Sequence, residues 1–343
     1  MPPCWPAADW VARLNESPMG NPAASMKFYD IFNGDADGIC ALHQLRLEQP
    51  RAAELVTGTK RDIELVGRVA AQAGDQLTVL DVSLRSNAQA VQRVLASGAS
   101  VEYFDHHAAG DIPQHPQFEA HIDTAPDVCT SLLVDRHLAG KHRLWAVVAA
   151  FGDNLVESAV RAAQPLQLDH TELARLHELG EAINYNAYGE TVNDLHYHPA
   201  DLYRAIAPYK DPRHFMFDEP VFEVLKQAGA EDLVCAEAVS PEFAADAAAL
   251  YILPDAAWSR RVNGVFGNRL AQAEPQRAHA VLVTKSDGSY TVSVRAPRNK
   301  PQGADVLCLA FAGGGGRKAA AGINELPQQE LPRFIAAFRS TYK

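Results

Sequence analysis

The sequence predicts an α/β protein: an N-terminal domain with a mainly parallel sheet and crossover helices, a helical connector, and a smaller mixed α/β C-terminal domain. Strand-like and helical segments alternate from residue 26 to about residue 107, which is typical of a parallel sheet with crossover helices. A hairpin signal appears after residue 278. The length of 343 residues suits two domains that each bury a core.

The first domain is expected to begin at Met26, because the Pro- and Ala-rich residues 1–25 are typical of a poorly ordered extension. Its predicted strands are KFYDIF (27–32), QLTVLDVSL (76–84) and SVEYFDHH (100–107), joined by helices near 38–49 and 87–97. Helical patterns continue to residue 189, and Asp153 lies near the end of one of them. We assign residues 26–183 to this domain and residues 184–255 to the helical connector.

The predicted C-terminal domain spans residues 256–343. HAVLVT (279–284) and YTVSVR (290–295) flank KSDGS, and an Asp-Gly pair between two strand-like runs predicts a β-hairpin. A short helix near 304–311, the run GGGG, a strand near 320–324 and a closing amphipathic helix complete this domain.

Charge divides along the chain. The net charge of −11 argues against broad binding to long nucleic acid. Residues 256–343 contain 13 Lys and Arg against 5 Asp and Glu, a net +8, so residues 1–255 carry −19. An acidic domain suits metal ions, and a basic domain suits anionic substrates.

Cysteine content and hydropathy predict a cytoplasmic location. The sequence has no apolar run as long as a membrane span, and its start lacks a basic region followed by an apolar stretch. The cysteines are scattered without a CxxC pair, which favours a reducing compartment and structural or incidental roles: Cys4, Cys40, Cys129, Cys235 and Cys308.

Acidic and His residues follow three predicted strands, at the edge where parallel sheets bind ligands. Asp35 and Asp37 in NGDADG repel each other, and a divalent cation would relieve this; a solvated turn is the alternative. Asp81 interrupts a strand that otherwise suits burial, so it needs a cation or several donors unless it caps a helix. In YFDHH, His106 could bind metal while His107 faces substrate.

The chain resembles the DHH phosphoesterase superfamily with its DHH-associated C-terminal domain. This superfamily includes RecJ-like exonucleases, nanoRNase-type oligoribonucleases, cyclic-dinucleotide phosphodiesterases and family II inorganic pyrophosphatases. DADG (35–38), VLDVS (79–83), FDHH (104–107) and AAFGDN (149–154) resemble its four motifs in order. The ordered set is far more specific than any one of its members.

The resemblance implies two divalent metal ions. Mn²⁺ is the usual metal of the family and Mg²⁺ is the alternative; both suit a site of carboxylates and one imidazole. Such a pair activates water and neutralises phosphoryl oxygens. His107 would contact the phosphate or protonate the leaving oxygen, and Asp105 would orient an imidazole. The implied metal ligands, with Asp81 bridging both ions, are Asp35, Asp37, Asp81, His106 and Asp153.

The sequence departs from the family pattern in two places. Many members have a further ligand of the first metal shortly before the DxD pair, where this chain offers Asn33 or the strand residue Asp30. In the C-terminal motif, alignment on AAG (320–322) places Gly314, Gly315 and Gly316 on the family glycines and Arg317 on the family histidine. Gly-rich backbone and Arg both bind phosphate, and Arg295 resembles the substrate-binding arginine.

These features predict hydrolysis of a phosphodiester or phosphomonoester in a small nucleotide, such as a short oligonucleotide or cyclic dinucleotide. The alternatives are a RecJ-like single-strand exonuclease, a 3′-phosphonucleotide phosphatase, and a non-catalytic nucleotide-binding regulator. No membrane partner is expected, and a homodimer is left open.

Overall fold

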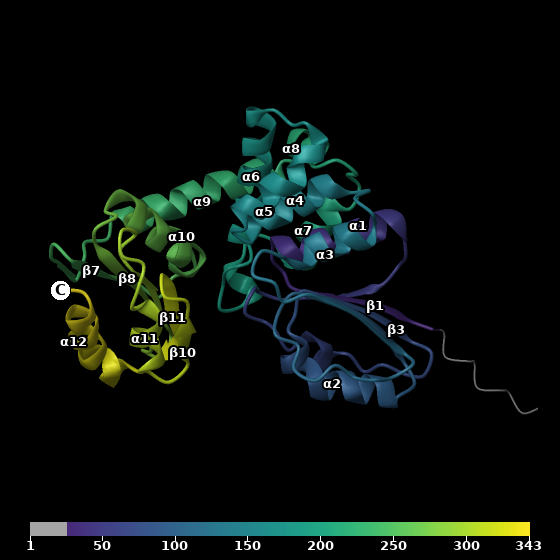
Figure 1. The fold of residues 1–343 in the computed structure, drawn as a ribbon, viewed down its shortest axis with the longest axis horizontal. Coiled ribbons are helices and arrows are strands. Elements are labelled where there is room, and N and C mark those ends of the chain that lie inside the picture. Colours follow the sequence, from purple (N-terminus) through teal and green to yellow (C-terminus); the bar gives the residue numbers. More distant parts are fainter. Residues whose placement is uncertain (1–25) are drawn as a thin grey trace, which may run out of the picture.

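The computed structural model describes residues 26–343, so the predicted extension at residues 1–25 lies outside the described residues. Figure 1 shows the chain divided into a larger N-terminal lobe and a smaller C-terminal lobe, with a long helix running between them. Each lobe contains one sheet. No helix within residues 26–343 is both long enough and apolar enough to cross a membrane.

Sheet A of the first lobe is parallel throughout, which confirms the mainly parallel sheet that the sequence predicted. Its strands in spatial order are β2 (Glu54–Val56), β1 (Phe28–Phe32), β3 (Gln76–Leu80), β4 (Ser100–Asp105) and β5 (Phe118–Ile122). The short β2 and the edge strand β5 were not predicted. Both are half exposed, so they lack the buried apolar pattern that marks the three central strands.

The three central strands have apolar residues on both faces, because helices cover each side of the sheet. Ile31, Val79 and Tyr103 pack toward α2 (Leu84–Ala96) with the 3₁₀ helix η1 (Leu65–Arg68). Their chain neighbours Phe32, Leu80 and Phe104 face the opposite helical layer. This alternation follows the two-residue period of a strand, and the apolar residues align across the sheet register.

On the second face of the sheet, α1 and α3 contact the strands and α4 packs on these two helices; the helical layer then extends to the other lobe (Figure 1). Helix α9 leads to the C-terminal lobe, and the 3₁₀ turns are η2 (Gln164–Leu166) and η3 (Val192–Asp194). The helices are α1 (Ala36–Glu48), α3 (Thr130–His137), α4 (Arg143–Gly152), α5 (Val156–Ala163), α6 (His170–Tyr185), α7 (Pro199–Ile206), α8 (Pro212–Asp218) and α9 (Val221–Glu237).

Sheet B of the second lobe is mixed. β7 and β8 are parallel and the other pairs are antiparallel. Helix α10 (Ala257–Ala273) packs on one face, while α11 (Ala304–Leu309) and α12 (Leu331–Thr341), preceded by η4 (Gln328–Glu330), cover the other. The order is β10 (Gly314–Gly316), β11 (Ala320–Leu326), β9 (Tyr290–Arg295), β8 (Ala278–Thr284), β7 (Ala248–Leu253) and β6 (Phe243–Ala244).

Two details of this lobe differ from the sequence interpretation. β6 and β7 lie in residues 184–255, which were assigned to the helical connector, yet β7 pairs with β8 and so forms part of sheet B. No strand was predicted for the GGGG run, whereas Gly314–Gly316 form the edge strand β10. Glycine-rich backbone gives no apolar strand signal, and pairing with β11 supplies the hydrogen bonds that hold it extended.

Candidate active site

The acidic and His residues of the DHH-like motifs meet at the carboxyl edge of sheet A. Asp35 follows β1, Asp81 follows β3, and Asp105 is the last residue of β4. Asp153 comes from the helical layer, where it is the C-cap of α4. Parallel strands all end at the same edge, so residues separated by more than 100 positions become neighbours there.

Asp35 and Asp37 are both buried, but they have different partners. Asp35 is the N-cap of α1, and its Oδ1 accepts hydrogen bonds from the backbone N–H groups of Asp37 and Gly38, each 3.0 Å long. Asp37 accepts hydrogen bonds of 2.7 Å from the backbone N–H groups of Thr130 and Ser131 in the first turn of α3. The positive end of α3 therefore stabilises the Asp37 carboxylate.

Asp81 lies one residue beyond β3 with a left-handed φ of 60°. This conformation is uncommon for a residue other than glycine and is found at functional sites. Thr130 Oγ1 donates to Asp81 Oδ1 over 3.1 Å. Burial, followed by repulsion from Asp37 and Asp35, raises the pKa of Asp81 well above its usual range. Asp81 is therefore a buried acid that a cation would stabilise.

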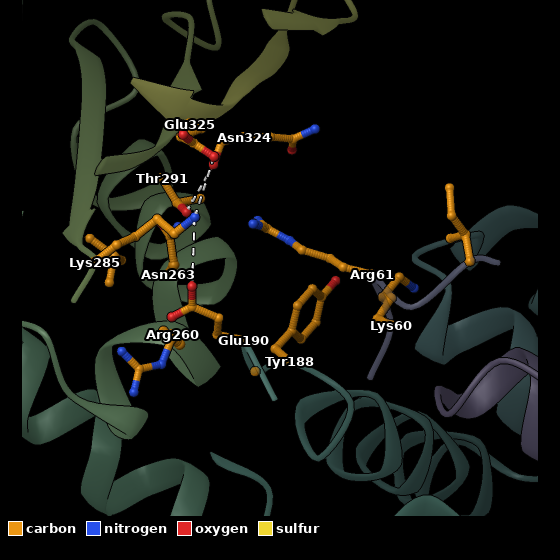
Figure 2. A pocket seen from close by; sticks show the side chains of 13 residues that line it. Lys60, Arg61, Tyr188, Glu190, Arg260, Asn263, Lys285, Thr291, Asn324 and Glu325 are labelled. Atoms are coloured by element: carbon orange, nitrogen blue, oxygen red, sulfur yellow. Dashed lines mark hydrogen bonds and ion pairs between the residues drawn. The ribbon is translucent and has the colours of Figure 1, made fainter. Parts of the chain in front are cut away.

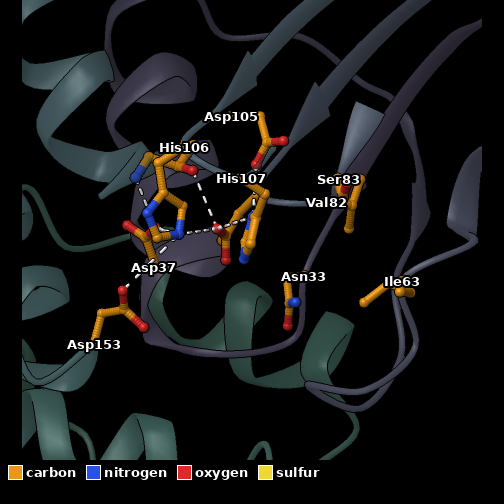
Figure 3. Close-up of polar contacts among 12 residues, drawn as sticks. Asn33, Asp37, Ile63, Val82, Ser83, Asp105, His106, His107 and Asp153 are labelled. Atoms are coloured by element: carbon orange, nitrogen blue, oxygen red, sulfur yellow. Dashed lines mark hydrogen bonds and ion pairs between the residues drawn. The ribbon is translucent and has the colours of Figure 1, made fainter. Parts of the chain in front are cut away.

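His106 lies among these carboxylates (Figure 3). Its Nδ1 is 2.9 Å from Val128 O and donates to that carbonyl, which leaves the lone pair on Nε2. Nε2 is 3.4 Å from Asp81 Oδ1, 3.9 Å from Asp153 Oδ2 and 4.0 Å from Asp37 Oδ2. The imidazole thus presents a metal-ligating atom to three carboxylates.

These donors fit a divalent cation. Ligand atoms of Asp37, His106 and Asp153 all lie within 4.8 Å of one another, as do those of Asp81, His106 and His107. Burial, with added repulsion from Asp37 and Asp35, raises the pKa of Asp153 despite the nearby Lys60. Mostly carboxylate ligands with one imidazole suit Mn²⁺ or Mg²⁺.

His107 and Asp105 form a hydrogen-bonded pair beside this cluster. His107 Nδ1 lies 2.8 Å from Asp105 Oδ1, and the imidazole is 45% exposed. Burial opposes the charged imidazole, but the hydrogen bond and charge of Asp105 outweigh it, so the pKa of His107 is raised. The accessible ring could therefore hold a proton next to the cluster of Asp37, Asp81 and Asp153 carboxylates.

Lys60 is a site residue that the sequence analysis missed. It follows β2, and its Nζ is 2.5 Å from Asp35 Oδ2 and 3.3 Å from Asp153 Oδ1. Burial raises the pKa of Asp35, but the Lys60 ammonium more than offsets this, so its net pKa is lowered. A lone lysine in a loop far from the acidic motifs carries no sequence signal for this role.

Neither early candidate for a further ligand belongs to the groups of ligand atoms described above. Asp30 accepts hydrogen bonds from Arg46 Nε (2.8 Å) and Nη2, and Arg46 also donates to Thr78. Asn33 donates through Nδ2 to Lys60 O over 3.2 Å, and its Oδ1 accepts from the Asp35 backbone over 3.3 Å. Both side chains already have protein partners in the described part of the chain.

The sequence matches no model of a known protein family and no curated protein. Solved structures are similar in fold. Exonuclease RecJ bound to manganese has a TM-score of 0.59 and 16% identity, covering 92% of this chain and 90% of that one. The DHH domain of PF0399, a member of the s1p family of ribosomal proteins, has a TM-score of 0.58 and 14% identity; the match covers 92% of this chain and 86% of that one. The pGpG-specific phosphodiesterase PggH from Vibrio cholerae has a TM-score of 0.53 and 14% identity; the match covers 92% of this chain and 99% of that one.

This chain shares its fold with these three structures. The match extends over both lobes, because 92% of the chain is covered in each comparison. The sequence-based recognition is thereby confirmed at the level of the fold.

Asp153, at the acidic edge of sheet A, also lines a cleft between the lobes. One cavity of about 590 Å³ is lined by Lys60, Asp153 and Asn154 from the first lobe and by Asn268 and Arg295 from the second. A neighbouring cavity of about 500 Å³ also has Lys60 in its wall, and the Arg61 side chain extends into it (Figure 2). Lys60 therefore lies where the two cavities meet.

Arg295 ends β9 and is held by neutral groups. Its Nε donates to Asn268 Oδ1 over 2.6 Å, and its Nη2 donates to Gly264 O over 3.2 Å. Burial lowers its pKa, slightly offset by Tyr188. A guanidinium fixed by neutral oxygens in the cavity that contains Asp153 keeps its charge available for an anion.

The Gly-rich segment lies next to this cavity at the edge of sheet B. Ala320 lines the cavity and pairs in register with Arg295, and β10 follows across β11. A Cβ on Gly314 would lie 1.9 Å from Cys308 O, whereas a Cβ on Gly315 would meet nothing within 4 Å. The exposed Arg317 lies in the turn between β10 and β11, where its N–H donates to Ala320 O.

Proposed function

We propose that the chain is a metal-dependent phosphoesterase that hydrolyses phosphodiester or phosphomonoester bonds of small nucleotides, short oligonucleotides or cyclic dinucleotides. The observation that carries this proposal is the convergence of Asp37, Asp81, Asp153 and the free Nε2 of His106 at one edge of sheet A. This donor set supports a resident Mn²⁺ or Mg²⁺ ion.

A divalent ion bound there would supply Lewis-acid stabilisation of phosphoryl oxygens and activation of water. The polypeptide contributes the remaining functions. Asp105 holds the His107 ring by a 2.8 Å hydrogen bond, and the raised pKa favours a proton on that ring. We assign His107 to contact the phosphate or to protonate the leaving oxygen, with Asp105 as the residue that positions it.

Substrate binding is assigned to the second lobe. Arg295 shares a cavity with Asp153, so a phosphate between them would contact a guanidinium on one side and the metal cluster on the other. Gly314, Gly315, Gly316 and Arg317 would contact the rest of the substrate. The net +8 of residues 256–343 supports an anionic substrate, and the overall −11 favours a small one.

A RecJ-like exonuclease acting on single strands is the second candidate. It is favoured by the similarity to exonuclease RecJ bound to manganese, with a TM-score of 0.59. The similarity to a pGpG-specific phosphodiesterase, with a TM-score of 0.53, favours a short substrate.

The test is product release by the full chain from linear dinucleotides, cyclic dinucleotides, 3′-phosphorylated nucleotides, single-stranded DNA and pyrophosphate. Each substrate is assayed with Mn²⁺ and with excess chelator. We expect turnover of a dinucleotide or cyclic dinucleotide that requires Mn²⁺. Preferred shortening of long single strands would instead establish the exonuclease, and tight nucleotide binding without any product would identify a non-catalytic regulator.

A further inference from the structure

The Lys60 ammonium lies between two of the implied metal ligands, Asp35 and Asp153. Its Nζ is 2.5 Å from Asp35 Oδ2, 3.3 Å from Asp153 Oδ1 and 3.3 Å from Asn184 Oδ1. Three oxygen atoms from three separate segments therefore converge on one cationic atom. This is the kind of environment that a hard cation requires.

The backbone of Lys60 is held in place on both sides. Its N–H donates to Ala187 O over 2.9 Å, and its carbonyl accepts a 3.2 Å hydrogen bond from Asn33 Nδ2. Asn33 stands where many relatives have an additional metal ligand. In this chain, the Asn33 amide fixes the loop from which Lys60 reaches Asp35.

We propose that the Lys60 ammonium takes the place of one of the two cations, so that each chain binds a single divalent ion through Asp37, Asp81, His106 and Asp153. Asp35 then acts as the counter-ion of Lys60. This inference rests on the proposed metal-dependent function and specifies its metal centre.

The hydrogen-bond partners of Asp35 support this assignment. Its Oδ1 accepts two backbone N–H groups and its Oδ2 is paired with the ammonium. An ion about 2.1 Å from Oδ2 would lie at most roughly 4.6 Å from the Lys60 nitrogen, and the two positive charges would repel. An ion near His106 instead has Asp37, Asp81 and Asp153 as partners.

Unlike a bound metal ion, the Lys60 ammonium cannot dissociate from the chain. Lys60 lines both cavities of the cleft, so its charge lies close to the space assigned to the phosphate. A covalently attached cation neutralises charge without exchanging with solvent, and a chelator cannot remove it. Removal of Lys60 should therefore create a second metal position rather than abolish the first.

The test is the number of Mn²⁺ ions per full chain, measured by elemental analysis after equilibrium dialysis. We expect one ion for the wild type and two for Lys60→Met, which removes the charge and retains a long side chain. The control Lys285→Met removes a lysine from the same interlobe region that pairs with Glu190 and Glu325, and should bind one ion. Two ions in the wild type, or one in Lys60→Met, would overturn the proposal.

A second pair of variants decides the question if Lys60→Met does not fold. Asp35→Asn keeps an Oδ1 acceptor for the α1 cap and should still bind one Mn²⁺ with an affinity within about threefold of the wild type. His106→Asn removes a ligand outside the Lys60 contacts, and its Mn²⁺ affinity should fall by more than roughly 100-fold, beyond the effect of losing a residue that only supports a ligand. Loss of the ion in Asp35→Asn to the same extent would overturn the proposal.

The outcomes separate this inference from the function on which it rests. A wild-type chain that binds no Mn²⁺ contradicts the metal-dependent function itself. A wild-type chain that binds two ions contradicts the role of Lys60 alone and leaves the phosphoesterase assignment standing.

Discussion

At the carboxyl edge of sheet A, Asp37 and Asp81 are buried with backbone N–H and hydroxyl groups as hydrogen-bond donors. At the end of β9 in sheet B, the half-buried Arg295 is hydrogen-bonded to neutral oxygens. One lobe thus holds negative charge in excess of its nearby cations, and the other holds a positive charge whose partners carry none. Charges held this way cost stability in a free protein and provide affinity for ions of opposite sign.

Within the first lobe, Lys60 supplies positive charge next to the carboxylates of Asp35 and Asp153. It lowers the net pKa of Asp35 in spite of burial, whereas the pKa of Asp81, which lacks such a cation, is raised. The comparison shows that a buried carboxylate is not by itself a metal ligand. Its remaining partners decide which role it has.

The largest expected effect comes from removing the charge of Asp81. Asp81→Asn should lower kcat/KM by more than roughly 100-fold, since it removes an anionic ligand rather than a residue that only supports one. In excess chelator the same variant should be more stable than the wild type by at least about 1 kcal/mol, because an uncharged amide replaces a buried acid among like charges.

Two measurements check this prediction for Asp81→Asn: steady-state kinetics with Mn²⁺, and thermal unfolding with and without the metal. Mn²⁺ should raise the melting temperature of the wild type and have little effect on the variant. Undiminished turnover by folded Asp81→Asn protein would show that the first lobe does not need this charge.

The second prediction concerns the positive side of the comparison. Arg295→Ala should raise KM by about 10- to 100-fold, the range expected for a lost charged hydrogen bond, with a smaller change in kcat. Arg295→Lys keeps the charge but loses the planar set of guanidinium donors. Its KM should lie between those of Arg295→Ala and the wild type.

Steady-state kinetics of Arg295→Ala and Arg295→Lys provide the test, with Mn²⁺ content as the control. The ion should stay bound in both variants, because Arg295 contacts none of the proposed ligands. Loss of Mn²⁺ with unchanged KM would mean that the second lobe binds the metal and the first lobe binds the substrate.

The sequence predicted the parts of the fold whose signals are local and repeated. The strands ending at Phe32, Leu80 and Asp105 have buried apolar residues and are followed by acidic motifs, so both their type and their common edge could be inferred. β7 was missed because a short apolar run such as AALYIL (248–253) does not by itself distinguish a buried strand from a buried helix.

The same distinction applies to the site. The motif residues could be named in advance, and the structure brings Asp37, His106 and Asp153 within reach of one ion. Lys60 could not be found, because its contact with Asp35 depends on how Asn33 and Ala187 hold its loop. The Thr130 and Ser131 N–H groups could not be found either, because the sequence does not show that they donate to Asp37.

The smallest expected effect is at the glycine-rich edge of sheet B, where the comparison predicts a change in substrate binding without a change in metal. Gly315→Val should weaken substrate binding several-fold, because its branched side chain would extend from β10 beside the Arg295 cavity. The fold should be retained, since a Cβ at this position meets nothing within 4 Å and Val suits a strand. Gly314→Val is the matched control for steric damage, since its Cβ would lie 1.9 Å from Cys308 O. Measurement of KM, melting temperature and Mn²⁺ content in both variants separates the effects. A Gly315→Val protein with normal KM would remove the glycine-rich segment from the substrate site and leave Arg295 as the anion-binding group of the second lobe.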